Sequence, residues 1–296
     1  MKTRAFFLII VAGVLWGTSG IFVHYLAPYG FSSLQMTAVR GTVSLVSMAI
    51  ALLILDRRLF LAGWKDVLLF VGSGLGFFGT ASCYFAAMQA TSVSTAVVLM
   101  YTSPVLVMLF SVLFLGERLT RLKMISVVCM LIGCGLVSGI IGGLRFRAVG
   151  ILLGVLSAIF YSAYNIFTKS ALRRGCNAMT VTLYTFFFMA LASVAASKPQ
   201  QIGTYVTKAP FTVILLMIGL GIFTSVLPYF LYTLALRDLP AGTASALSIV
   251  EPMAATVFSV LLFREALDAF SLIGILLILL AVFLLSRAEK TCQKNE

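Results

Sequence analysis

The 296-residue chain is 61% hydrophobic and only 10% charged, and its mean hydropathy is +1.11. A soluble domain carries about 25% charged residues, so this chain has too few polar side chains to cover a surface in water, and lipid is the solvent that it fits. The net charge of +12 does not indicate nucleic-acid binding, because the basic residues form short groups between apolar runs, such as Arg57–Arg58 and Arg173–Arg174.

Apolar runs define the expected membrane segments. A spanning helix needs about 20 predominantly apolar residues. Runs between polar or basic breaks predict ten such helices, at 4–23, 34–55, 67–88, 94–115, 123–141, 149–168, 178–197, 211–234, 242–263 and 271–286. The first run could pass for a signal peptide. We expect it to be retained, because Gly13–Val14–Leu15 recurs as Gly154–Val155–Leu156.

The two halves of the chain repeat each other. Predicted helix four carries Thr95–Ala96, Leu99, Pro104 and Phe110–Ser111–Val112–Leu113 before Glu117, and helix nine carries the same residues 148 positions later. Helices three and eight share a Gly-x-Gly-x-Phe pattern and a Tyr–Phe pair at an offset of 145 positions. This repetition predicts two five-span repeats, at 1–143 and 147–287, followed by a cytoplasmic tail at 288–296.

The odd number of spans in each repeat predicts that the repeats insert in opposite orientations. If the N-terminus is cytoplasmic, 15 of the 21 basic residues fall in cytoplasmic segments, five fall outside and Arg40 lies within a span. This is the bias that positive-inside insertion produces. The turn at 117–123 holds three basic residues and its counterpart at 264–268 holds one. We therefore expect an inverted repeat with both termini cytoplasmic, a plan common in secondary transporters that bind solute near the midplane.

Four short elements of the sequence belong together. They are Leu15-Trp16-Gly17 and Arg40 in the first two predicted helices, Tyr101-Thr102-Ser103-Pro104 leading to Gly116-Glu117, and Glu251-Pro252 leading to Glu265; the last two elements stand at equivalent positions in the two halves. With these motifs the chain resembles the ten-helix EamA-type branch of the drug/metabolite transporter superfamily over nearly its whole length. The second copy departs from the family pattern at Arg264, where a glycine is usual, and at Ser157–Ala158, which stand in place of Trp–Gly.

The resemblance implies an all-α integral membrane fold of two inverted five-helix repeats around a central cavity. It also implies export or exchange of metabolites, such as amino acids and related compounds, across a prokaryotic cytoplasmic membrane without ATP. The expected partners are the solute and the lipid bilayer; coupling to protons, electroneutral exchange and uniport stay open as alternatives. We expect no nucleic acid, metal or other cofactor, and a monomer or homodimer.

Glu251 and Arg40 are the ionisable residues that lie well inside predicted spans. A charge at the bilayer centre costs about 2.5–3.5 kcal/mol, so it normally faces a cavity or a partner. At 1.5 Å per residue, Glu251 lies ~15 Å from the cytoplasmic start of its helix and Arg40 ~9 Å from the outer start of its own, and these are similar depths in a core about 30 Å thick. We expect them to pair or to share a water-filled cavity. Glu251 then binds a cationic group or a proton, or it braces helices.

Other polar and aromatic residues are candidates for the wall of that cavity, although tyrosine and tryptophan also favour membrane interfaces. Besides Arg40 and Glu251, the predicted set is Trp16, Ser19, Tyr84, Tyr101, Ser103, Tyr161, Asn165, Tyr229 and Tyr232. Pro104 and Pro252 are predicted to kink their helices at symmetric positions, either as hinges or as packing features. Lys169 is expected to extend to the membrane edge.

Two other residue patterns are interpreted as structural. Gly-xxx-Gly motifs at 13–17, 72–76, 139–143 and 150–154 predict close helix packing. The five cysteines have no CxxC or Cys/His spacing, so they predict neither a disulfide framework nor a metal site.

Other classes of membrane protein fit the sequence less well. An intramembrane serine protease would need a histidine on another span to activate Ser19, but the single histidine, His24, lies on the same predicted helix. At five residues' separation the two side chains point about 140° apart. No HExxH or phosphate loop occurs, so no catalytic residue is predicted. A channel would present rings of charge or a backbone filter; a channel, receptor or purely structural protein stays the alternative.

Overall fold

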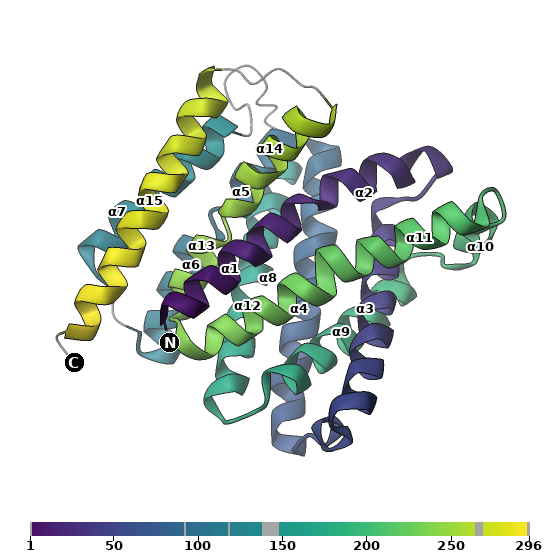
Figure 1. Cartoon of the computed structure of the whole chain (residues 1–296), viewed down its shortest axis with the longest axis horizontal. Helices are drawn as coiled ribbons and strands as arrows, with labels where there is room; N and C mark the ends of the chain where they lie inside the picture. Colours follow the sequence, from purple (N-terminus) through teal and green to yellow (C-terminus); the bar gives the residue numbers. More distant parts are fainter. Residues whose placement is uncertain (1, 92, 118, 138–147, 264–268, 295–296) are drawn as a thin grey trace.

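The computed structural model shows an all-helical bundle (Figure 1). It describes residues 2–91, 93–117, 119–137, 148–263 and 269–294. Within that part of the chain, nine helical stretches are long and apolar enough to cross a membrane. A further helix, α7 (Arg121–Val137), has 17 described residues and packs along α15 (Ala269–Lys294). The predicted all-α membrane fold is therefore confirmed, with nine or ten spans.

Several spans form single unbroken helices. They are α3 (Ser33–Leu55), α4 (Trp64–Ala90), α8 (Ala148–Arg173), α9 (Ala178–Ala196) and α15, which runs through most of the predicted tail. A short helix that the sequence pattern does not predict, α10 (Gln200–Val206), follows α9. Short 3-10 turns, η1 (Ala27–Tyr29) and η2 (Arg57–Phe60), begin the connections after spans one and two.

The other four spans are interrupted near their middle. The first consists of α1 (Lys2–Gly17) and α2 (Ser19–Leu26), the fourth of α5 (Val93–Met100) and α6 (Ser103–Leu115), and the ninth of α13 (Ala241–Leu247) and α14 (Val250–Phe263). The eighth consists of α11 (Pro210–Gly221) and α12 (Leu227–Asp238), joined by a π-helical turn, η3 (Ile222–Val226).

Hydroxyl side chains explain three of these interruptions. Thr18, Thr102 and Ser248 lie at the breaks, and each donates its hydroxyl to the carbonyl three residues earlier, at 2.7, 2.6 and 2.6 Å. Such bonds compete with the helical backbone ladder. Pro104 and Pro252 follow two of the breaks, and neither can donate an N–H to the preceding turn. The structure therefore interrupts both helices where the prolines predict kinks.

Contacts between helices follow the internal repeat. Spans three and six (α4 and α8) pack against each other, and so do their counterparts in the other repeat, spans eight and one (α12 and α1). Spans four and six (α6 and α8) are also in contact, and so are their counterparts, spans nine and one (α14 and α1). The pairs α3 with α9, α6 with α13, and α7 with α15 map onto themselves. The pattern of helix contacts is thus the same when the two repeats are exchanged. In Figure 1, α7 and α15 form one edge of the bundle, and the start of α1 and the end of α15 both lie at the lower left.

Glycines allow the closest of these contacts. A Cβ atom on Gly133 of α7 would lie 2.8 Å from the carbonyl oxygen of Gly274 on α15, and one on Gly274 would lie 2.7 Å from the carbonyl oxygen of Gly133. On α1, a Cβ atom on Gly17 would lie 2.8 Å from the Cβ of Ala254. The Gly-xxx-Gly motifs at 13–17, 72–76 and 150–154 face neighbouring helices as predicted, whereas the motif at 139–143 lies outside the described residues.

Gly133→Ala is expected to lower the midpoint of thermal unfolding of the detergent-purified protein. The added methyl forces α7 and α15 apart, and overpacking of this kind costs about 1–3 kcal/mol. Gly203→Ala on α10 is the control, because nothing lies within 4 Å of the Cβ position there. Both substitutions gain helix propensity, so only the packing differs. An equal midpoint for the two variants would contradict the close α7–α15 contact.

Candidate functional site

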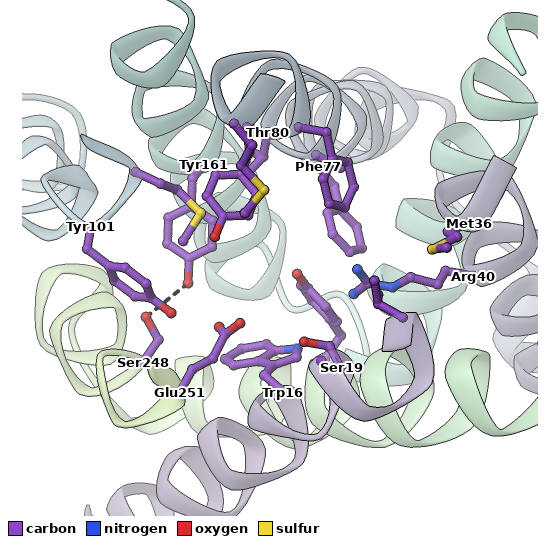
Figure 2. Close-up of a pocket in the computed structure, with 18 of the residues that line it drawn as sticks. Trp16, Ser19, Met36, Arg40, Phe77, Thr80, Tyr101, Tyr161, Ser248 and Glu251 are labelled. Carbon is purple, nitrogen blue, oxygen red and sulfur yellow. Dashed lines mark hydrogen bonds between the residues drawn. The ribbon is translucent and has the colours of Figure 1, made fainter. Parts of the chain in front are cut away.

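A cavity of about 370 Å³ lies between the two repeats (Figure 2). Its wall includes Val23 of α2 and Met88 of α4, near the helix ends that the charge bias places outside the cell. Nine of the eleven predicted wall residues line it: Trp16, Ser19, Arg40, Tyr84, Tyr101, Ser103, Tyr161, Tyr229 and Glu251. Tyr232 and Asn165 do not line it; the Asn165 side chain is fully buried on α8, where its amide donates to the carbonyl of Tyr161 at 2.8 Å.

The sequence analysis does not identify several other wall residues. They include Met36, Phe77, Thr80, Met100 and Ser248. An apolar residue in a span has the same sequence signature whether it faces a cavity or a neighbouring helix, so the methionines and Phe77 could not be assigned. Ser248 could have been predicted from the sequence, because it is a hydroxyl residue one turn before Glu251 and Pro252.

One end of the cavity is acidic and rich in hydroxyl groups. Glu251, in the first turn of α14, is half-buried and points into the cavity beside Trp16 and Ser248 (Figure 2). The indole Nε1 of Trp16 and the hydroxyl of Tyr101 are buried there, and neither has a hydrogen-bond partner among the described residues. Buried polar groups of this kind normally have a partner. This end of the cavity therefore has a carboxylate that faces the cavity and two unsatisfied donors buried in its wall.

The opposite end is basic because Arg40 is fixed there by the π-helical turn. Its Nε donates to the Ser225 hydroxyl at 3.0 Å, and its Nη2 donates to the carbonyl of Thr224 at 3.0 Å. Proline at position 228 has no N–H to offer the carbonyl four residues earlier, which is that of Thr224. Arg40 thus satisfies a backbone group that its own helix cannot satisfy, as a protein in lipid requires.

Arg40 and Glu251 share the cavity instead of forming a direct contact. Figure 2 shows them entering from opposite sides, and no ion pair joins these two described residues. Of the two arrangements expected from the sequence, the shared cavity is the one observed.

Aromatic rings connect the two charged ends. The ring of Tyr229 lies 4.2 Å from that of Phe77 and 4.9 Å from that of Trp16, measured between centroids. The Trp16 ring also lies 5.5 Å from that of Tyr232, which is fully buried beside the cavity. The cavity floor is therefore a packed aromatic layer contributed by spans one, three and eight.

Hydrogen bonds between helices of the second repeat close the cavity behind this floor. The Tyr161 hydroxyl donates to the hydroxyl of Ser248 at 3.4 Å, and the Tyr232 hydroxyl donates to the Asn165 side-chain oxygen at 2.5 Å. Asn165 therefore belongs to the closing layer below the cavity. We find no group of three or more metal-ligating side chains in the described part of the chain.

Lys169 lies one further turn along α8, and the expectation that it extends to the membrane edge is wrong. Its side chain is buried, with 6% exposure. Its Nζ donates to the carbonyl of Leu239 at 2.7 Å and also to that of Leu236, both at the end of α12. The last carbonyls of a helix have no intrahelical donor, so this ammonium group caps the end of span eight.

Glu117 and Arg173 complete the closure at the helix ends. The Glu117 carboxylate accepts a hydrogen bond from the backbone N–H of Ala241 at 3.0 Å, at the N-terminus of α13. It also lies 3.6 Å from Arg173, whose guanidinium donates to the carbonyl of Leu115. The end of span four is thereby fastened to spans six and nine, so these contacts cross from one repeat to the other.

A bundle of apolar spans around a mainly aromatic cavity with two charged residues in its wall, closed at one end, is the architecture expected of a membrane transporter. The profile of the EamA-like transporter family matches residues 3–139 and again residues 148–287. The chain therefore belongs to the EamA-like transporter family and consists of two EamA repeats. The family consists of transporters, which confirms the prediction that the chain is not an enzyme.

Relatives named as transporters occur in archaea and bacteria. An uncharacterized transporter of Archaeoglobus fulgidus is 28% identical over 281 residues, which cover 93% of this chain and 94% of that protein. The pseudopaline exporter CntI of Pseudomonas aeruginosa is 26% identical over 208 residues, 70% of this chain and 71% of CntI. The fold is similar to that of a protein solved by crystallography, with a TM-score of 0.81, 20% identity and 99% coverage of both chains.

Lys169→Met is expected to destabilise the sealed end of the bundle. The substitution leaves the carbonyls of Leu236 and Leu239 buried without a donor, and each unsatisfied group costs about 1–3 kcal/mol. The midpoint of thermal unfolding in detergent should fall by several degrees. Lys198→Met removes an exposed lysine from the α9–α10 connection and should leave the midpoint unchanged. Equal midpoints would mean that Lys169 does not cap α12.

Proposed function

We propose that this chain exports a small zwitterionic metabolite, an amino acid or a related compound, across the cytoplasmic membrane by alternating access. The observation that carries the proposal is the placement of a carboxylate and a guanidinium on facing walls of one cavity. A solute with an ammonium group and a carboxylate complements both walls at once. A volume of about 370 Å³ suits a small solute, since ligand pockets span about 300–1,000 Å³.

The surroundings of each charge support this orientation of the solute. Glu251 lies beside the ring of Trp16, and an ammonium group is attracted both by a carboxylate and by an aromatic face. Arg40 is held by Ser225 and Thr224 through Nε and Nη2. Its remaining N–H groups can receive a carboxylate, which guanidinium binds with matched geometry.

Of the two roles open to Glu251, solute or proton binding is favoured over a structural brace. A brace would join Glu251 to a charged partner on another helix, and no ion pair to this residue occurs among the described residues. Arg40, in contrast, combines both roles, because it satisfies the backbone of η3 and still lines the cavity.

Alternating access requires that the sealed end open while the other end closes. The interrupted spans supply places where half-helices can reorient, and in the described structure the breaks at Thr18, Thr102 and Ser248 are next to cavity-lining residues. Inverted repeats allow the same rearrangement to occur at either end. Export as the direction is supported by the relative named as an exporter, CntI.

Counterflow in proteoliposomes tests the transport mechanism. Vesicles loaded with a millimolar unlabelled amino acid should transiently accumulate the labelled compound from outside, because a carrier exchanges solutes. A channel or receptor would equilibrate the label or leave it outside, and either result would contradict alternating access. Repeating the uptake with and without a pH gradient tests the proton as a coupling ion.

Matched substitutions of Glu251 and Arg40 test the proposal that the solute is a zwitterion. The wild type should prefer an amino acid to both its decarboxylated amine and its deaminated acid. In Glu251→Gln, the preference for the amino acid over the deaminated acid should fall about ten- to a hundredfold. In Arg40→Gln, the preference for the amino acid over the decarboxylated amine should fall by a similar factor, since hydrogen bonds to charged groups contribute roughly 1.5–3 kcal/mol. Arg57→Gln, at an exposed turn outside the cavity, is the control. Parallel losses for all three compounds would oppose the assignment.

If Glu251 carries the proton, Glu251→Gln should also abolish the effect of a pH gradient on uptake while leaving counterflow measurable. An unchanged response to the gradient would remove the proton from the role of Glu251.

A further inference from the structure

A second cavity, of about 260 Å³, lies at the end of the bundle where the connections after spans two and six meet. It is lined by residues of η2, the start of α4, the turn after α8 and the start of α9, including Arg58, Leu61, Asp66, Arg174 and Thr180. None of its lining residues belongs to the solute cavity. The second cavity is therefore separate from the solute cavity.

The charge of this second cavity is positive. Arg174 donates to the carbonyl of Lys65 at 3.1 Å and lies 3.4 Å from Asp66, so one guanidinium and one carboxylate partly neutralise each other. Arg58 is exposed, and no ion pair to its guanidinium occurs among the described residues. A guanidinium without a carboxylate partner inside a cavity suits a phosphate group, which arginine binds through two parallel hydrogen bonds.

The walls of the second cavity are fixed before any ligand arrives. The Thr180 hydroxyl donates to the carbonyl of Leu59, and the Tyr184 hydroxyl donates to that of Phe60, both at 2.8 Å, so η2 is attached to α9. The rings of Tyr184 and Phe70 stack with centroids 5.1 Å apart. The turn after α8 is set by Gly175, whose φ of 88° favours glycine.

Exposed apolar residues lie close in sequence to the lining of the second cavity, and one of them, Leu61, lines it. Ile54, Leu55, Leu61 and Trp64 are 77, 67, 80 and 81% exposed. In a chain that spans a membrane, exposed apolar side chains contact acyl chains, and an exposed tryptophan marks the interface with the headgroups. The Lys65 ammonium lies 5.8 Å from the Trp64 ring centroid. A ligand in this cavity thus lies near both basic groups and exposed apolar side chains.

We propose that the second cavity binds the headgroup phosphate of an anionic phospholipid from the adjacent leaflet, with Arg58 as its main charged contact. A free phosphate ion shares the charge but makes no use of the exposed apolar side chains. Basic pockets between membrane helices recognise anionic headgroups through this combination. The inference is independent of which solute the protein transports.

The test uses the full-length protein in detergent, with the neighbouring arginine as a matched control. Phosphatidylglycerol should raise the thermal midpoint and remain bound in native mass spectrometry, whereas phosphatidylcholine and millimolar inorganic phosphate should do neither. Arg58→Gln should reduce the bound phosphatidylglycerol several-fold. Arg57→Gln, which removes the same charge outside the cavity, should not.

Three results would overturn the proposal. Retention of phosphatidylcholine equal to that of phosphatidylglycerol would mean that the cavity does not recognise the charge of the headgroup. Stabilisation by inorganic phosphate alone would make the cavity a site for soluble anions. Equal losses in Arg57→Gln and Arg58→Gln would mean that lipid responds to the general basic surface. Arg58 has no ion-pair partner in the described structure, so its substitution should leave folding intact and the comparison interpretable.

Discussion

Backbone carbonyls that have lost their helical partners are the constraint on which this structure depends. In lipid, such groups must be satisfied by the protein itself. Three basic side chains donate hydrogen bonds to such carbonyls. Arg40 donates to that of Thr224, four residues before Pro228; Lys169 donates to the last carbonyls of α12; and Arg173 donates to that of Leu115, at the end of α6. The basic side chains of the spans are thus placed where helices are interrupted or end, and the positions of these interruptions determine where positive charge enters the membrane.

Equivalent helices of the two repeats make equivalent contacts, but some are unbroken in one repeat and interrupted in the other. Spans three and six, α4 and α8, are unbroken and pack against each other, whereas their counterparts, spans eight and one, contain the π-helical turn and the break at Thr18. The charged residues are likewise present in one copy, because the counterpart of Glu251 is Ser103. One side of the cavity is therefore a rigid pair of helices, and the other is made of segmented helices that carry irregular backbone and polar groups.

The sequence was sufficient to predict features that depend on composition along one helix. Span lengths, the duplication and the breaks before Pro104 and Pro252 follow from apolar runs and proline chemistry, and the charged residues of the cavity follow from their cost in lipid. Features that depend on the rotation of one helix against another were missed. Lys169 could reach either water or the end of α12, and only the packed structure shows that it reaches α12. Pro228 was a readable signal for the partner of Arg40, since it predicts an unsatisfied carbonyl at Thr224.

The unpartnered donors beside Glu251 have a consequence for discrimination among cargoes. The Trp16 indole and the Tyr101 hydroxyl are buried whether or not a solute is present. A compound whose acceptor reaches these donors gives them a hydrogen bond, whereas a hydrocarbon of the same shape leaves both as they are in the empty cavity, a difference of about 1–3 kcal/mol for each donor. A mainly aromatic chamber thus prefers polar cargo to apolar molecules of the same size through the bonds that the polar cargo gains.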